Sequence, residues 1–196
     1  MIVLLMAALA VGCHHDGPDG TGRPSAAVVE TARRQAGDAA TGLTATLFTE
    51  LSRAVVQEPP GRAVAVCGDV AQRLTADAAR REGISIRRTG LRLRNSANAP
   101  DEYERRVLER WAVPGTPPAP VSEVLETADG GYELRYLRPI VLQPLCTRCH
   151  GTQEAIPPAI HDVLAERYPD DQAVGFHPGD IRGAVSVRIR LTTGGD

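Results

Sequence analysis

The stretch DGGYELRYLRPIVLQPLCTRCHG, residues 129–151, runs from a predicted β-hairpin into a cluster of sulfur and imidazole side chains. Its first three residues, Asp129-Gly130-Gly131, separate two runs of strand-forming residues, 121–127 and 132–137, as a hairpin turn does. Its end is a C-x-x-C-H motif made of Cys146, Cys149 and His150. The stretch therefore predicts an antiparallel sheet that leads directly into a chemically reactive site.

The rest of the chain places long helices before strands. Apolar spacing and helix start and stop residues predict helices over residues 26–57, 62–81, about 98–111 and 157–167. Extended structure is expected over residues 83–95, with strand alternation at 91–94, and over 183–191. Helices followed by antiparallel strands indicate the α+β class, in one domain that spans residues 26–196.

The composition argues against a nucleic-acid partner. The chain of 196 residues has a net charge of −2, and all of its positive side chains are Arg or His because it has no Lys. Aromatic residues make up only 4% of the chain, too few for a stacking surface that would bind single strands.

The first residues, MIVLLMAALAVGC, form an apolar run that ends in small residues and Cys13. Such a run suits a signal peptide over residues 1–12 and is too short to cross a bilayer as an ordinary helix. Ala10-Val11-Gly12-Cys13 resembles the bacterial lipoprotein box, in which the cysteine is acylated, although no Arg or Lys precedes the run. The alternatives are an ordinary secretory signal and a buried N-terminal helix.

Residues 13–25 are rich in Gly, Pro and Asp, which predicts a flexible tether behind the acylated Cys13. This organisation predicts an exported protein that is lipid-anchored to a bacterial membrane and lies in the periplasm or elsewhere outside the cytoplasm. His14 and His15 fall in the tether and are expected to be solvated.

Three chemistries use a C-x-x-C-H stretch. Covalent attachment of c-type haem uses both thiols for thioether bonds and the histidine as an iron ligand, and it fits an exported chain. A zinc site would need Cys67 as a fourth ligand beside Cys146, Cys149 and His150, but Cys67 stands alone in the sequence. Dithiol exchange expects the motif at a helix start after a strand, in a βαβ context that this chain does not show. Haem is therefore the favoured cofactor.

The second axial ligand of such a haem can be narrowed by elimination. Methionine occurs only at positions 1 and 6, inside the predicted signal peptide, and lysine does not occur. The remaining candidates are Cys67, His161, His177, His14 and His15. On its own, Cys67 is equally well explained as a small apolar residue on a helix face.

Three blocks of the chain resemble a known family. They are CGDVAQRLTADAARREGISIRRTGLRLRNSANAPDEYE at 67–104, CTRCHG at 146–151 and YPDDQAVGFHPGDIRGAVSV at 168–187. They resemble PAS-like c-type haem domains, which are found free-standing and as extracytoplasmic sensor regions of bacterial histidine kinases. The resemblance spans roughly residues 44–190 and implies a PAS-like antiparallel sheet.

The resemblance also implies one covalently attached haem c. Cys146 and Cys149 would form the thioether bonds, and His150 and Cys67 would be the axial ligands. With Cys13 acylated, no cysteine would remain for a disulfide. Two protein ligands leave no open iron site, so the chain is not expected to be an enzyme.

Two functions fit these expectations. The first is a redox or small-gas sensor, in which reduction or a diatomic gas displaces Cys67. The second is a low-potential electron-transfer cytochrome that keeps both ligands. A thiolate ligand favours ferric iron, which lowers the potential. No kinase domain or transmembrane helix follows Asp196, so we expect a separate redox or signalling partner rather than a fused output domain.

Arginines on the predicted strand are candidates for binding the haem propionates, because guanidinium matches carboxylate geometry. They are Arg87, Arg88, Arg92 and Arg94, with Arg92 and Arg94 assigned to the cofactor. For any one of them, a solvated charge on the outer face of the strand is an equally good interpretation.

Overall fold

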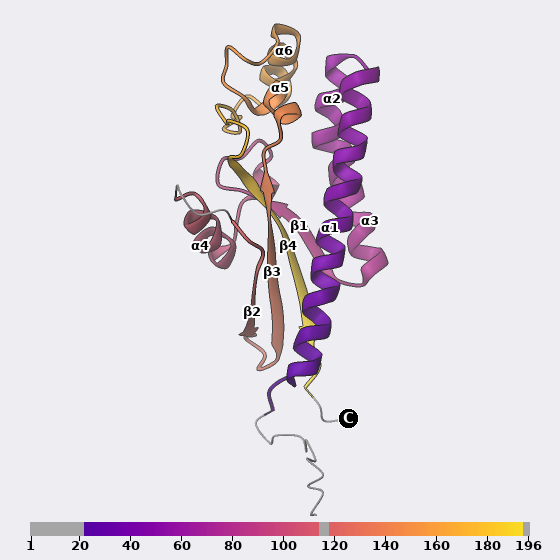
Figure 1. Ribbon diagram of the computed structural model, residues 1–196, viewed down its shortest axis with the longest axis vertical. Coiled ribbons are helices and arrows are strands. Elements are labelled where there is room, and N and C mark those ends of the chain that lie inside the picture. Colours follow the sequence, from indigo (N-terminus) through magenta and orange to yellow (C-terminus); the bar gives the residue numbers. More distant parts are fainter. Residues whose placement is uncertain (1–21, 114–117, 194–196) are drawn as a thin grey trace, which may run out of the picture.

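The computed structural model describes residues 22–113 and 118–193, which form a four-stranded antiparallel sheet covered by helices (Figure 1). The sheet has the order β1-β4-β3-β2 and consists of β1 Ser85–Thr89, β2 Val121–Glu126, β3 Tyr132–Val141 and β4 Ile181–Leu191. The helices are α1 Ala26–Gln57, α2 Pro60–Ala65, α3 Ala71–Glu82, α4 Glu102–Trp111, α5 Thr147–His150 and α6 Pro158–Arg167. The predicted α+β class, with an antiparallel sheet and long N-terminal helices, is confirmed. The predicted signal peptide and lipidation site Cys13 lie outside the described residues.

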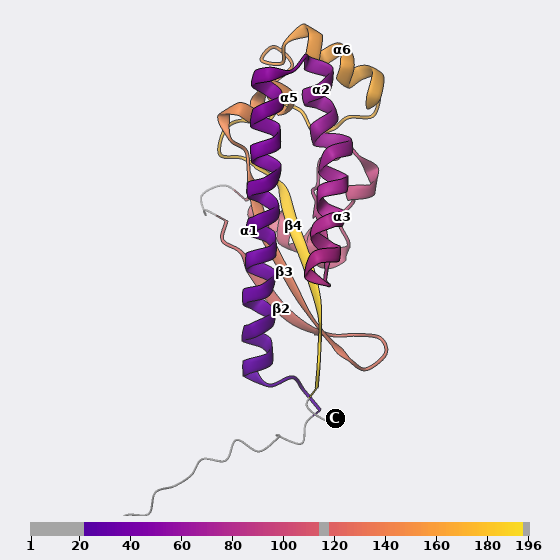
Figure 2. The ribbon, with the colours of Figure 1, turned by 90° about the vertical axis from the view of Figure 1, so that its right-hand side faces the viewer.

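Alternation along the strands gives the sheet two apolar faces. Leu134, Tyr136 and Val187 pack with residues of α1 and α3 on one face. Leu137 and Ala184 point to the other face, where they pack with α4. Successive side chains on a strand point to opposite faces, so one sheet can be covered on both sides (Figures 1 and 2).

The hairpin that the sequence predicts is present. Strand β2 pairs with β3 from Val121–Leu137 to Glu126–Tyr132. Gly130 sits in the turn with a φ of 78°, a conformation that favours glycine. Strand β3 extends four residues beyond the predicted end, to Val141, and so carries the chain toward the cysteine motif.

Helix α1 has the predicted bounds. The side chain of Ser25 caps it by accepting a hydrogen bond from the Val28 amide at 3.3 Å. Ala36 and Ala40 are fully buried, so small side chains let this helix lie close to the sheet. Within residues 22–113 and 118–193, none of the helices is both long and apolar enough to span a membrane.

The expected uninterrupted helix over residues 62–81 is corrected by the structure. Helix α2 begins at Pro60, and a π-helical turn at Val66–Val70 separates it from α3, which ends at Glu82. A π turn takes one more residue per turn than an α-helix, so the face on which later residues lie is shifted. The periodicity of the sequence could not show this shift, which occurs at Cys67.

The strand expected at residues 91–94 is also wrong, because β1 ends at Thr89. Strand β4 approaches very closely here, and a side chain on Gly183 would overlap the carbonyl oxygen of Thr89. Beyond this point the backbone makes other hydrogen bonds. The carbonyl oxygen of Arg92 accepts from Arg182, and that of Leu93 accepts from the Gln172 amide at 2.8 Å. The segment is therefore a loop held by contacts that are distant in the sequence.

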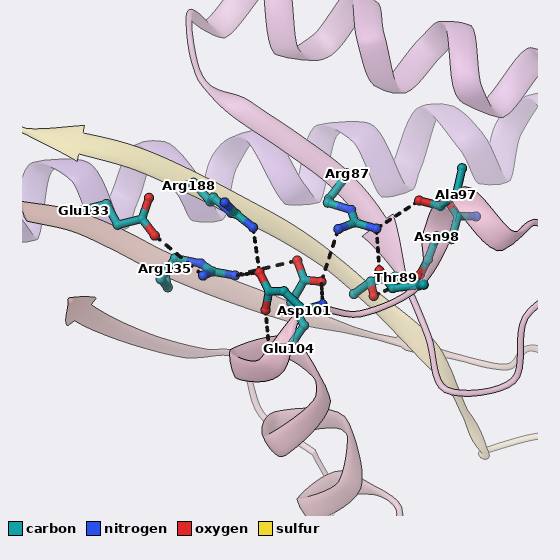
Figure 3. A network of polar contacts seen from close by, with 10 residues as sticks. Arg87, Thr89, Ala97, Asn98, Asp101, Glu104, Glu133, Arg135 and Arg188 are labelled. Carbon is teal, nitrogen blue, oxygen red and sulfur yellow. Dashed lines mark hydrogen bonds and ion pairs between the residues drawn. The ribbon is translucent and has the colours of Figure 1, made fainter. Parts of the chain in front are cut away.

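Helix α4 is attached to the sheet by a partly buried polar network (Figure 3). Asp101 and Glu104 form a capping box at the start of the helix. The Asp101 carboxylate also accepts hydrogen bonds from Arg135 and Arg188, each at 2.6 Å. Arg87 belongs to this network, since its Nη1 lies 3.5 Å from the Glu104 carboxylate, and it also donates to the carbonyl oxygens of Ala97 and Ala99. The network thus joins α4 to strands β1, β3 and β4.

We expect Asp101→Ala to lower the free energy of unfolding by about 2–4 kcal/mol, measured by urea denaturation of the apoprotein. The change removes a helix cap and leaves the Arg135 guanidinium, whose side chain is only 6% exposed, without this carboxylate. Asp101→Asn is the matched control, because asparagine caps helices but carries no charge. If both variants unfold like the parent, the network contributes nothing to stability.

The loss should depend on pH. Burial by itself raises the pKa of Asp101, but the Glu104 amide, the Arg135 hydrogen bond and the charges of Arg135 and Arg188 outweigh it and lower the pKa below its usual value. The charged carboxylate therefore stabilises the fold above the unfolded pKa of about 3.9, and this contribution is lost as the pH falls through the folded value. The difference between parent and Asp101→Asn should accordingly be largest near neutral pH and shrink in acid.

Candidate functional site

One cavity of about 660 Å³ lies beside α1 at the end of the sheet where β3 runs into α5. Its lining includes the three residues of the C-x-x-C-H motif and also Cys67, which is far away in the sequence. A volume in the range of about 300–1,000 Å³ is typical of cofactor and small-molecule sites. Four residues singled out by the sequence are thus brought to one site.

The motif folds as a short helical segment. A 3₁₀ turn at Pro144–Cys146 leads into α5, and the Thr147 hydroxyl donates to the carbonyl oxygen of Pro144 at 2.7 Å. Cys146 and Cys149 are three residues apart in this helical segment, which places their side chains on the same side. Cys67, Cys146 and Cys149 are all free thiols. Burial raises the pKa of Cys149 to about 11, so its thiol stays protonated at neutral pH.

The imidazole of His150 is held in one orientation. Its Nδ1 lies 2.6 Å from the carbonyl oxygen of Ala173 and donates to it. Burial, reinforced by the charges of Arg94 and Arg182, lowers the pKa of His150 well below its usual range. The ring is therefore neutral, and with Nδ1 protonated the lone pair of Nε2 is free to bind a metal.

Residues 173–176, which follow α6 and form a segment called the clamp, contact this motif from outside the cavity. The Gly175 amide donates to the carbonyl oxygen of Gly151 at 2.6 Å, and the Phe176 amide donates to that of His150 at 2.9 Å. The Phe176 ring also meets the imidazole edge-on, with 6.4 Å between the ring centroids. Backbone hydrogen bonds of this kind carry no sequence signal, so the sequence alone could not show that Gly175 and Phe176 contact the cysteine motif.

Asp171 connects the clamp to the loop after β1. Its carboxylate accepts from Arg94 Nε at 2.9 Å and from the Ala173 amide at 2.8 Å. Arg94 Nη2 in turn donates to the carbonyl oxygen of Cys149 at 2.6 Å. Sequence reasoning missed Asp171, because one of its partners, Arg94, lies 77 residues away and the other is a backbone amide, that of Ala173.

Cys67 reaches the cavity from the π-helical turn between α2 and α3. Arg88 on β1 donates to its carbonyl oxygen at 3.4 Å. A side chain on Gly68 would overlap the hydroxyl of Tyr168, so the turn packs tightly against the end of α6. Burial raises the pKa of the Cys67 thiol, and the charges of Arg88 and Arg94 partly offset this rise. The net shift favours the protonated thiol over the thiolate.

Only two of the four candidate arginines line the cavity. Arg88 and Arg94 line the cavity, whereas Arg87 is used in the α4 network on the opposite face. Arg92 is not part of the lining. Its guanidinium lies 4.1 Å from the centre of the Phe176 ring and donates to the carbonyl oxygen of Gln172. Two arginines that sequence reasoning missed, Arg138 and Arg182, also line the cavity.

The other candidate ligands lie elsewhere. His161 and His177 are exposed, and neither belongs to the lining of the cavity. His14 and His15 lie outside the described residues. Over residues 22–113 and 118–193, no three His, Cys, Asp or Glu side chains are grouped closely enough to hold a metal ion by themselves, so the four-ligand zinc arrangement is not formed.

The chain is similar to a known protein family and to one solved structure. The Tll0287-like family matches residues 25–190. No curated protein matches the chain. A solved structure described as that of the cyanobacterial haem protein Tll0287 is 26% identical, with a TM-score of 0.54, over 67% of this chain and 75% of that one. The resemblance found in the sequence is confirmed, and the chain belongs to the Tll0287-like family.

Proposed function

We propose that this protein binds one haem in the cavity beside α5, attached covalently through Cys146 and Cys149. The observation that carries the proposal is the meeting of both thiols, the His150 imidazole and Cys67 at one cavity of about 660 Å³. The structural relative is described as a haem protein, and it has the same fold. Bound haem supplies a one-electron iron couple.

The residues of the chain fit this group. The sulfur atoms of Cys146 and Cys149 lie on the same side of one helical segment, as two thioether bonds to one porphyrin require. His150 is neutral and offers Nε2 to the iron, because Ala173 accepts the Nδ1 proton. Cys67 offers a sulfur ligand from the π turn, and coordination to iron would deprotonate the thiol that burial keeps protonated. Arginines that line the cavity have buried nitrogens without a hydrogen-bond acceptor among the described residues, which suits a ligand that carries negative charge.

The experiment that tests haem binding uses the full chain produced with cytochrome c maturation. We expect an absorption spectrum of low-spin haem, a pyridine haemochrome typical of two thioether bonds, and an intact mass that includes one haem. A mass of the polypeptide alone, or one zinc ion per chain in place of haem, would refute the proposal.

We further propose that the bound haem makes the protein a redox or small-gas sensor in which Cys67 is the mobile ligand. A thiolate favours ferric iron, and reduction removes this advantage. Cys67 lies in a π turn between two helices, and such turns are frequent at functional sites. Release of Cys67 would then move α2 and α3, and a separate partner protein would read this movement.

Carbon monoxide distinguishes this role from electron transfer. If Cys67 leaves on reduction, the ferrous protein should bind carbon monoxide rapidly, as followed by the shift of the Soret band. If the ferrous protein keeps thiolate ligation and excludes carbon monoxide, the protein is a low-potential electron-transfer cytochrome instead, and the sensor proposal fails.

We also propose that the mature protein is exported and held at a bacterial membrane by a lipid on Cys13. The supporting observation is the Ala10-Val11-Gly12-Cys13 box followed by a polar tether. Stable anchoring generally needs two or more lipid chains, which lipoprotein processing supplies. Cys13→Ser should move the haem protein from the membrane fraction to the soluble fraction of the cell. An unchanged distribution would refute the anchor.

A further inference from the structure

Three arginines meet at the cavity from separate segments of the chain. Arg88 comes from β1, Arg94 from the loop that follows, and Arg182 from the start of β4. Each has a buried nitrogen without a hydrogen-bond partner among the described residues: Arg88 Nε, Arg94 Nη1 and Arg182 Nε. A buried guanidinium nitrogen without an acceptor is costly, so this cluster is built for a partner outside the polypeptide.

The charges of the cluster are not balanced by the protein. Arg94 pairs with Asp171 at 2.8 Å, and both side chains are at most 10% exposed. Within residues 22–113 and 118–193, Arg88 and Arg182 have no carboxylate within ion-pair distance, and no Asp or Glu lines the cavity. Burial, and after it the charge of Arg94, lowers the pKa of Arg182 to about 10. Two buried positive charges therefore remain without a counter-charge.

We propose that Arg88 and Arg182, with Arg94 between them in the chain, bind the two carboxylates of a dicarboxylate ligand. This inference rests on the proposed function, under which that ligand is the haem and the carboxylates are its propionates. The number of surplus charges equals the number of propionates, and guanidinium groups bind carboxylates by paired hydrogen bonds.

Other arginines near the cavity are poorer candidates. Arg92, to which the sequence assigned this role, has its guanidinium on the Phe176 ring outside the lining. Arg138 lines the cavity but has no buried nitrogen without a partner. Arg182, in contrast, lines the cavity, has a buried Nε without a partner, and is oriented by donating Nη1 to the carbonyl oxygen of Arg92 at 3.0 Å. Arg92 thus supports Arg182 through its backbone, independently of its own side chain.

The test compares haem with haem dimethyl ester, which lacks both carboxylate charges. The full chain carrying Cys146→Ala and Cys149→Ala is titrated with each compound, so that affinity is not hidden by covalent attachment. Haem should bind about tenfold to a hundredfold more tightly than the ester, as expected for charge-assisted hydrogen bonds. Adding Arg182→Gln or Arg88→Gln should weaken haem binding and leave ester binding nearly unchanged, so that the ratio moves toward one.

Arg92→Gln is the matched control and should keep the full ratio, since the backbone oxygen that orients Arg182 remains. Equal binding of haem and ester to the chain without arginine changes would overturn the propionate assignment while haem binding stands. That comparison does not require any arginine variant to fold. The assignment would also be overturned if Arg92→Gln lost the preference for haem over the ester while Arg88→Gln and Arg182→Gln both kept it. Failure of both compounds to bind would overturn the assignment together with haem binding.

Discussion

Replacing Cys146 and Cys149 together with alanine is expected to abolish covalent retention of haem. The structure places both thiols on one short helical segment that lines the cavity, and the other free thiol described, Cys67, lies on a different segment. A single replacement leaves one sulfur and should therefore retain part of the haem, whereas the double replacement should retain none. The measurement is haem-dependent peroxidase staining after denaturing electrophoresis, together with intact mass.

The control for this experiment is Cys67→Ala, which should keep the covalent haem because it removes no thioether sulfur. Membrane fractionation of the double variant should also match the parent, since Cys13 is unchanged. Haem that stays attached to the double variant under denaturing conditions would show that the attachment site is elsewhere.

Cys67→Ala is expected to convert a low-spin thiolate–imidazole spectrum into a high-spin or water-ligated ferric spectrum. Alanine has no donor atom, and the cavity lining holds no second histidine to take the place of Cys67. The reduction potential should rise by on the order of 100 mV, because axial ligands alone move haem potentials over about 0.8 V. Ferric electron paramagnetic resonance and a spectroelectrochemical titration measure the two effects.

The matched controls are His161→Gln and His177→Gln. Both histidines are exposed and lie outside the lining, so each variant should keep the ferric spectrum and the potential of the parent. If Cys67→Ala retains the ferric spectrum of the parent, Cys67 is only a packing residue. A change of ligation in either histidine variant would then identify the true ligand.

Several elements could be predicted because their signals are local. The hairpin follows from Asp129-Gly130-Gly131 between two strand-forming runs, and α1 follows from apolar spacing at residues 26–57. The C-x-x-C-H motif is contiguous, so the place of Cys146, Cys149 and His150 in one short segment was evident. Cys67 was a weaker prediction, since elimination left it beside four histidines and only the resemblance selected it.

The sequence by itself determined the class of fold and the chemical groups available, because periodicity, turns and a contiguous motif depend on neighbours in the chain. Tertiary structure alone decided which groups meet. It ended β1 at Thr89, placed Cys67 in a π turn, and turned Arg92 onto Phe176. It also brought Arg182 and Asp171 to the site. These outcomes depend on contacts between segments far apart in the chain, for which a single sequence carries no local signal.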